Sequence, residues 1–388
     1  MTGQFFAVET QAWAKVCDLG LNPAIAYLVL AQGSQKDNRS TNWATHAVET
    51  HTGISRPKAK RALELLEDRG LIKMTRPKPR PWFDLLPGYP DTRTLNAAQR
   101  AFLQALAAGR PAPTPAAGDD LEALRTQGLI HVSKTGTITV APGAVPDWIW
   151  LPNKLVIGAK HETTPVDRLR QSRDVEALRL LVDLYGVQNL AEYGGVPPTL
   201  LSGSYTRAEV GTQGAYVVYG FCRQGVSLGN HSLIDRRLAA AGCKDEILDS
   251  LHQQFNRLYS LGLIECTPIL FEGLDADAEP LHPLDPRPDD PVLHDLAATA
   301  GSAAMAMLTE PQQARALLHE MTVVPVERHI ADVQLVDVYR LRYRPHTGLT
   351  AAWWADTRQR SQDALAHYTR LRERALDVAD PRKRATSM

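Results

Sequence analysis

A cluster of basic side chains that begins at residue 56 is the strongest chemical feature of the sequence. Residues 56–80 contain nine lysines or arginines and three acidic residues, a net charge of +6 in a chain whose 43 basic and 43 acidic residues cancel. Arginine can pair with guanine edges, and lysine can meet guanine or phosphate. The candidate contact residues in this cluster are Arg56, Lys58, Lys60, Arg61, Lys73, Arg76, Lys78 and Arg80.

Four of these residues lie at the start of a predicted helix over residues 56–69. Ser55 is expected to be the N-cap of this helix, and Gly70 stands where a glycine commonly follows a helix end. Apolar residues recur at helical spacing and predict a buried face formed by Ala59, Ala62, Leu63 and Leu66. Cations at a helix N-terminus are disfavoured by the helix dipole, so their placement favours an anionic partner.

The elements around this helix complete a small domain. Asn22-Pro23 predicts the start of a helix that ends at Gly33, and a second helix is expected from about Thr41 to Thr50. Ser40, Thr41 and Asn42 would open that second helix, where its N-terminus could meet a phosphate. Strands are expected over 71–74 and 82–86.

Three helices followed by a β-hairpin resemble the winged-helix fold, a variant of the helix-turn-helix, over residues 22–86. The resemblance depends on the helix-turn-helix spacing and on Arg69-Gly70-Leu71-Ile72, which leads into the wing. It implies that the N-terminal half of helix 56–69 enters the major groove of DNA. It also implies that the basic residues of the hairpin contact the DNA backbone.

The helix–glycine–strand ending recurs twice further along the chain. Gly70-Leu71-Ile72 is followed by Gly128-Leu129-Ile130 and by Gly262-Leu263-Ile264. We therefore expect a winged-helix domain over 1–90, a degenerate second unit over 91–145, and a third winged-helix-like domain over 146–272. The third domain would carry a long insert at 188–240, for which the sequence indicates no role.

The remaining part of the chain is expected to begin after a linker. Residues 273–291 are acidic and rich in proline, which is typical of a solvated linker. A C-terminal α+β region would follow over 292–388, with a long helix at 349–378. The expected fold class is therefore mainly α with small β-hairpins, an α+β chain of tandem winged-helix domains.

Two segments are candidates for contact with a homodimer mate or another protein. One is the second unit, residues 95–140, whose helix 119–127 carries three acidic residues and one basic residue. The other is the long helix, in which Ser361, Ala364, Tyr368, Leu371 and Ala375 form a short seam with spacings of three and four. Packing of this seam within one chain is the alternative.

Signatures of other chemistry are missing from the sequence. It contains no phosphate-binding glycine loop, no dinucleotide-binding glycine motif and no serine nucleophile elbow. No cysteine pair has the spacing of a zinc site. We therefore expect no enzyme activity, no cofactor and no metal. Four widely spaced cysteines and short apolar runs favour a cytoplasmic protein without a membrane span.

These observations favour a sequence-specific binder of double-stranded DNA, and a transcriptional regulator is the first hypothesis. A replication initiator of a plasmid, phage or integrative element is the second, because tandem winged helices in a chain of this size are similar in architecture to plasmid initiators. A non-catalytic assembly protein that docks proteins through its winged helices is the third. The DNA site and any effector ligand stay open.

Overall fold

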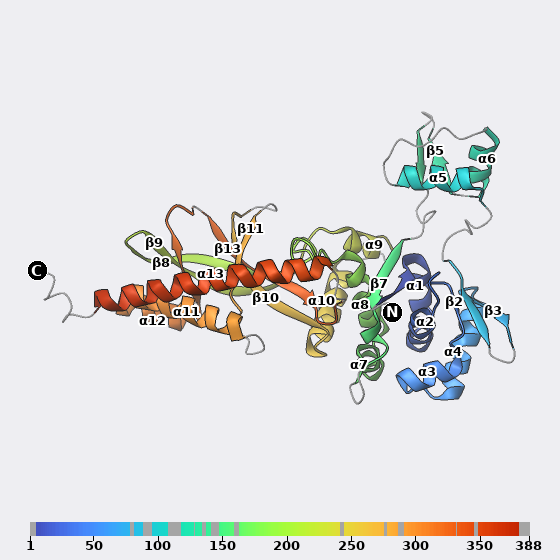
Figure 1. The fold of residues 1–388 in the computed structure, drawn as a ribbon, viewed down its shortest axis with the longest axis horizontal. Helices are drawn as coiled ribbons and strands as arrows, with labels where there is room; N and C mark the ends of the chain where they lie inside the picture. Colours follow the sequence, from blue (N-terminus) through green and yellow to red (C-terminus); the bar gives the residue numbers. More distant parts are fainter. Residues whose placement is uncertain are drawn as a thin grey trace, which may run out of the picture. The chain divides into compact units, whose positions relative to one another are not determined.

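The computed structural model shows a chain that divides into two compact units. Met1–Gly186 with Tyr343–Pro345 forms the first, and Val187–Arg342 with His346–Met388 forms the second. Both units combine α-helices with antiparallel sheets (Figure 1), so the expected α+β class is confirmed. The structure describes residues 5–77, 81–87, 95–107, 118–127, 129–133, 137–140, 147–158, 163–240, 244–274, 278–285, 291–330, 332–344 and 348–379.

The first unit begins with a strand that pairs with a distant segment of the chain. Strand β1 (Phe5–Glu9) pairs antiparallel with β7 (Trp148–Pro152), and α1 (Thr10–Cys17) follows β1 directly. The carboxylate of Glu9 caps α1, because it accepts hydrogen bonds from the backbone N–H groups of Gln11 and Ala12 at 3.0 and 2.8 Å. The partner strand lies far away in sequence, so local patterns did not indicate this pairing.

Three helices and a three-stranded sheet form the part of this unit that carries the basic cluster. The helices α2 (Leu21–Gln32), α3 (Thr45–Thr52) and α4 (Arg56–Asp68) pack against one another. The sheet has the order β2-β4-β3, formed by β2 (Ser40–Thr41), β4 (Trp82–Leu85) and β3 (Ile72–Arg76). Helix α2 is the centre of the core, since every residue from Pro23 to Ala31 is buried.

Gly33, at the end of α2, leaves room for the ring of Trp43. A Cβ on Gly33 would lie only 2.2 Å from that ring, and the ring stacks on His51 with centroids 4.7 Å apart. We expect Gly33→Ala to destabilise the first unit by about 1–3 kcal/mol, because Trp43 must leave its position. Denaturation followed by tryptophan fluorescence measures this loss. Gly301→Ala, at a helical site with open space, should instead be neutral or stabilising, and equal behaviour of both variants would refute the packing argument.

A separate small core follows in the sequence. It is formed by α5 (Ala97–Ala107), α6 (Gly118–Thr126) and the hairpin of β5 (Ile130–Val132) and β6 (Ile138–Val140). Leu103, Leu124 and Ile130 are among its buried residues. The helix–strand ending that the sequence indicated here is therefore present. The first unit also contains a short 3-10 helix (Asn153–Leu155), α7 (Pro165–Ser172) and α8 (Val175–Val187).

A six-stranded antiparallel sheet organises the second unit, in the order β11-β10-β13-β8-β9-β12. The segment expected to be an insert supplies its longest strands, β8 (Leu201–Gln213) and β9 (Tyr216–Leu228). The other strands are β10 (Ile264–Glu272), β11 (Glu279–Pro283), β12 (Thr322–Glu327) and β13 (Val333–Leu341). The sheet is larger than the small hairpins that the sequence led us to expect.

This sheet crosses two of the expected domain boundaries. The predicted linker 273–291 contains β11, which pairs with β10, so the segment does not separate two domains. Strand β10 pairs with β13 as well as with β11, so it is not half of a local wing hairpin. The helix before it, α10 (Lys244–Ser260), belongs to the second unit with α9 (Ser232–Ala240), whereas nearly all of α8 belongs to the first. The prediction of a single domain over 146–272 is therefore wrong.

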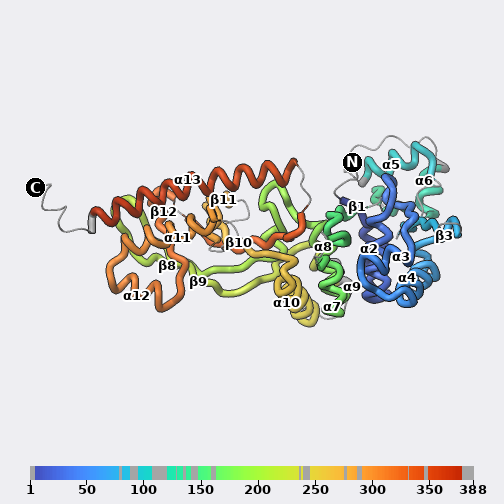
Figure 2. The backbone as a smooth tube through the Cα atoms, turned by 60° about the horizontal axis from the view of Figure 1, so that its bottom comes forward, coloured from blue at the N-terminus to red at the C-terminus, as the bar shows by residue number. Residues whose placement is uncertain are grey.

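Helices from the C-terminal third cover the sheet. Helix α13 (Gly348–Ala379) packs against α11 (Pro291–Met307), and α12 (Glu310–Leu318) lies between α11 and β12 in sequence. Figure 2 shows α13 running along the length of the second unit. The seam residues Ser361, Tyr368, Leu371 and Ala375 are buried within the chain. The seam is therefore used for internal packing and does not offer a surface to a second copy.

A buried histidine of the second unit lies between two polar groups. His282 lies beside Tyr368, with 2.9 Å between Nε2 and the hydroxyl oxygen, and its Nδ1 is 3.2 Å from the carbonyl oxygen of Pro283. A neutral ring with the proton on Nδ1 satisfies both contacts. Burial lowers the pKa of His282 from 6.5 to about 4.

We therefore expect this histidine to remove stability as the pH falls from 6.5 to 4. In that window the unfolded chain binds a proton that the folded chain does not, which costs roughly 3 kcal/mol at pH 4. Chemical denaturation at several pH values measures how the free energy of unfolding changes with pH. In the His282→Gln variant, the slope of the unfolding free energy against pH should correspond to about one proton fewer than in the unmodified chain. Parallel curves for the two proteins would show that His282 titrates normally.

Candidate nucleic-acid interface

Helix α4 separates apolar and basic residues on opposite sides. Ala59, Ala62, Leu63 and Leu66 are buried against the rest of the first unit, as the sequence predicted. All four basic residues of its first half are exposed: Arg56, Lys58, Lys60 and Arg61. The first half of the helix therefore presents four cationic side chains to solvent.

The charges on α4 run against the helix dipole. The first turn contains no acidic residue and the last turn no basic one, while Glu64, Glu67 and Asp68 lie in the C-terminal half. Lys60 pairs with Glu64 at 3.5 Å, in an exposed contact. Among the described residues, Arg56, Lys58 and Arg61 have no ion-pair partner. This arrangement is unfavourable for an isolated helix and is compensated when an anion approaches its N-terminal half.

The start of α4 has no side-chain cap. Ser55 occupies the N-cap position, as expected, but its side chain makes no capping hydrogen bond. Pro57 at the beginning of the helix is compatible with this end because proline lacks a backbone N–H. Free N–H groups at a helix N-terminus can bind an anionic oxygen. Cationic side chains and backbone donors thus point to the same kind of ligand.

The adjacent sheet carries two further exposed cations. Lys73 and Arg76 are exposed on β3, and β3 lies beside α4 (Figure 1). Gly70 lies in the connection between α4 and β3. Its φ of +66° is the left-handed conformation expected at that turn. Lys78 and Arg80, the other predicted members, lie outside the described residues.

The residues expected to open the second helix lie elsewhere. Ser40 and Thr41 form β2, which pairs with Asp84 and Phe83 of β4, and α3 begins only at Thr45. Thr41 is buried and its hydroxyl donates to the carbonyl oxygen of Gly33 at 2.8 Å. Pairing with a distant strand outweighs the local capping preference of the Ser40-Thr41-Asn42 stretch. Asn42 is exposed, but it is not a helix cap.

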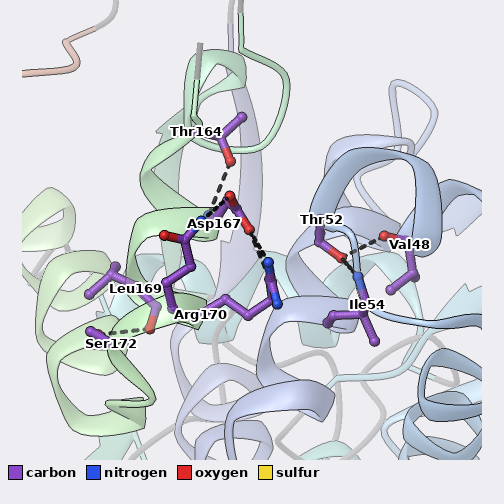
Figure 3. A network of polar contacts seen from close by, with 9 residues as sticks. Val48, Thr52, Ile54, Thr164, Asp167, Leu169, Arg170 and Ser172 are labelled. Atoms are coloured by element: carbon purple, nitrogen blue, oxygen red, sulfur yellow. Dashed lines mark hydrogen bonds and ion pairs between the residues drawn. The ribbon is translucent and has the colours of Figure 1, made fainter. Parts of the chain in front are cut away.

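Two hydrogen bonds of the Thr52 hydroxyl hold the turn between α3 and α4 where it leaves α3. The hydroxyl of Thr52 donates to the carbonyl oxygen of Val48 at 2.6 Å and accepts from the backbone N–H of Ile54 at 3.2 Å (Figure 3). Gly53 in this turn has φ of +64°, which disfavours residues with a side chain. These contacts set the direction in which α4 leaves the turn.

Arg170 of α7 lies against this turn and was not predicted to belong to the site. A Cβ on Gly53 would be 3.7 Å from its Nη2 atom, and its guanidinium pairs with Asp167 at 2.7 Å (Figure 3). Residue 170 falls within the domain expected over 146–272, and no local sequence pattern places α7 beside α3. Because its guanidinium pairs with Asp167 of the same helix, Arg170 is engaged within α7 where α7 approaches the turn.

The corresponding helix of the small core, α6, lacks such cations. Helix α6 contains Asp119, Asp120 and Glu122 against Arg125 alone, and Arg125 lies 3.8 Å from Glu122. Asp120 accepts hydrogen bonds from Asn96 and Gln99 at 3.2 and 2.8 Å, so its carboxylate supports the small core. Helix α6 therefore has the wrong charge for binding an anion.

Comparisons with known proteins and searches for other sites add little. No family model, curated protein or solved structure matches the chain. Within the described ranges, no three His, Cys, Asp or Glu side chains form a group that could hold a metal ion. Of the helices in the described part of the chain, none is long and apolar enough to cross a membrane. The cationic surface around α4 is the candidate site that the structure supports best.

Proposed function

We propose that the chain is a winged-helix protein that binds double-stranded DNA, with α4 in the major groove and β3 and β4 as the wing. The order α2, β2, α3, α4, β3, β4 supports this proposal, because it is a helix-turn-helix followed by a two-stranded hairpin. The turn from α3 to α4 is three residues long and begins with Gly53. Such short glycine-containing turns are typical of helix-turn-helix motifs.

One observation carries the proposal: exposed cations are concentrated in the first half of α4, where the helix dipole disfavours them. A solvated amphipathic helix would gain stability from the opposite distribution of charge. A phosphate backbone at the N-terminal half would stabilise the cations, and guanine edges lie within reach of arginine in the major groove. The same helix buries its apolar face, so its basic face is held in a fixed direction.

The proposed role is that of a sequence-specific binder, with transcriptional regulation as the first hypothesis. Selection of bound fragments from random duplex DNA tests sequence specificity directly. An enriched motif is expected, and its location at promoters or at a replication origin would separate a regulator from an initiator. Weak binding without a motif would contradict the proposal and favour a protein-docking role.

A further inference from the structure

The second unit contains a cavity of about 610 Å³ that the proposed function does not use. It lies between the first half of α13, strands β10 and β11, and residues 191–193. This volume is in the usual range for small-molecule sites in proteins. All of the residues that line it belong to the second unit.

The inner wall of this cavity is apolar and aromatic. Ile269, Phe271 and Trp353 are buried residues of the wall, and Tyr193 and Leu281 extend it. Such a wall binds the flat apolar body of a ligand, since burial of that body removes apolar surface from water. It does not by itself select a charge.

The charged residues of the lining give the cavity a negative balance. Glu192, Glu279 and Asp356 contribute carboxylates, and Arg360 is the cation among the lining residues. Arg360 pairs with Asp356 at 2.9 Å and also donates to the carbonyl oxygen of Pro280, so its charge is already engaged. Glu192 accepts a hydrogen bond from the neutral amide of Asn189 at 2.9 Å, which leaves its charge in place. Two carboxylates thus remain without a balancing cation in the lining.

The aromatic wall is held in its position before any ligand binds. The indole N–H of Trp353 donates to the carbonyl oxygen of Glu192 at 3.2 Å, which ties α13 to residues 191–193. A Cβ on Gly194 would lie 2.6 Å from the Trp353 ring, so the ring packs closely on this backbone. The guanidinium of the buried Arg340 lies 4.2 Å from the centroid of the same ring. Trp353 already has a cationic neighbour, so the carboxylates, not this ring, would position a ligand charge.

We propose that this cavity binds an organic cation with a flat aromatic body, such as an aromatic amine. The apolar wall would take the ring system, and Glu192 and Glu279 would pair with the ammonium group. An aromatic acid of the same shape would meet two carboxylates and be rejected. The proposal is independent of DNA binding, because its residues are all in the second unit and those of α4 are in the first.

Calorimetric titration of the full chain with three indole derivatives tests this proposal. Tryptamine carries a cation, tryptophol is neutral and indole-3-acetate carries an anion, while their ring systems are the same. We expect tryptamine to bind at least about tenfold more tightly than tryptophol, and indole-3-acetate not to bind. Equal affinity for all three, preference for the acid, or no binding of tryptamine at millimolar concentration would overturn the proposal.

Variants of the two carboxylates locate the binding. Glu192→Gln and Glu279→Gln should each weaken tryptamine binding about tenfold, and the double Glu192→Lys, Glu279→Lys variant should bind indole-3-acetate instead. Glu373→Gln removes an exposed carboxylate of α13 that does not line the cavity, and it should leave the affinity unchanged. If the reversed variant is folded and still prefers tryptamine, the cation binds elsewhere.

Discussion

Replacing Arg56 and Lys58 with glutamate is expected to weaken binding to duplex DNA by roughly 100-fold or more. The two side chains are exposed at the start of α4 and have no ion-pair partner among the described residues, so they are free to meet DNA. Their reversal removes two favourable contacts and adds two repulsive ones. Because neither side chain is part of the core, the melting temperature should not fall. Fluorescence anisotropy with a labelled duplex measures the affinity, and thermal denaturation measures the fold.

A matched control is available in the small core formed by α5, α6, β5 and β6. Arg125→Glu makes the same change on α6, whose neighbours are acidic, and it should change DNA affinity less than about threefold. If the double variant of α4 keeps its affinity while remaining folded, α4 is not the DNA-contacting helix. If Arg125→Glu has the larger effect, the small core that contains α6 contacts the DNA instead.

Replacing Asp337 with alanine is expected to destabilise the second unit by about 2–4 kcal/mol. Asp337 is fully buried in the six-stranded sheet. Its carboxylate accepts a hydrogen bond from the hydroxyl of Tyr205 at 2.7 Å and pairs with Arg223 at 2.8 Å. Burial and the hydrogen bond to Asp337 raise the pKa of Tyr205, so that phenol stays protonated and continues to donate. Without Asp337, the hydroxyl loses its acceptor, while the half-exposed Arg223 can be rehydrated.

Asp332 offers a comparison within the same unit. It pairs with Arg207 at 3.3 Å, but its side chain is 52% exposed, compared with 1% for Asp337. Asp332→Ala should therefore cost less than about 1 kcal/mol. Urea denaturation of both variants measures the difference. Equal losses would show that burial does not determine the strength of these two pairs.

Local sequence patterns predicted the elements that are stabilised by near neighbours. The spacing of Ala59, Ala62, Leu63 and Leu66 gave α4 within one residue, and Gly70 marked its end. The long C-terminal helix was found for the same reason, since its buried positions recur every three or four residues. These elements form their backbone hydrogen bonds within themselves, so a short window of sequence contains most of the information.

Strands with distant partners could not be predicted in this way. Strands β8 and β9 lie in the segment for which no role was expected, and β11 lies in a segment that looks like a linker because it is rich in proline and acidic residues. Each forms its hydrogen bonds with another strand, so its stability depends on residues that a local pattern does not include. Thr41 shows the same limit in the candidate site, because its burial depends on pairing with Phe83 of β4.

The cationic part of the candidate site was predictable because the charges and the helical spacing of the residues are both evident from the sequence. Arg56, Lys58, Lys60 and Arg61 are exposed on α4 as expected. The approach of Arg170 was not predictable, since α7 lies beside the α3–α4 turn only in the folded unit. Sequence thus indicated which side chains could contact DNA, and the structure added which distant helix lies beside the turn before α4.

The dependence of duplex affinity on salt tests the central claim most directly. Each phosphate that the protein neutralises releases counterions, so log affinity falls linearly with log salt concentration. With six exposed cations on α4 and β3, we predict a slope of roughly −4 to −5, as about five neutralised phosphates would give. A slope near zero, or no measurable binding at low salt, would contradict the assignment of α4 and its wing as a DNA-binding surface.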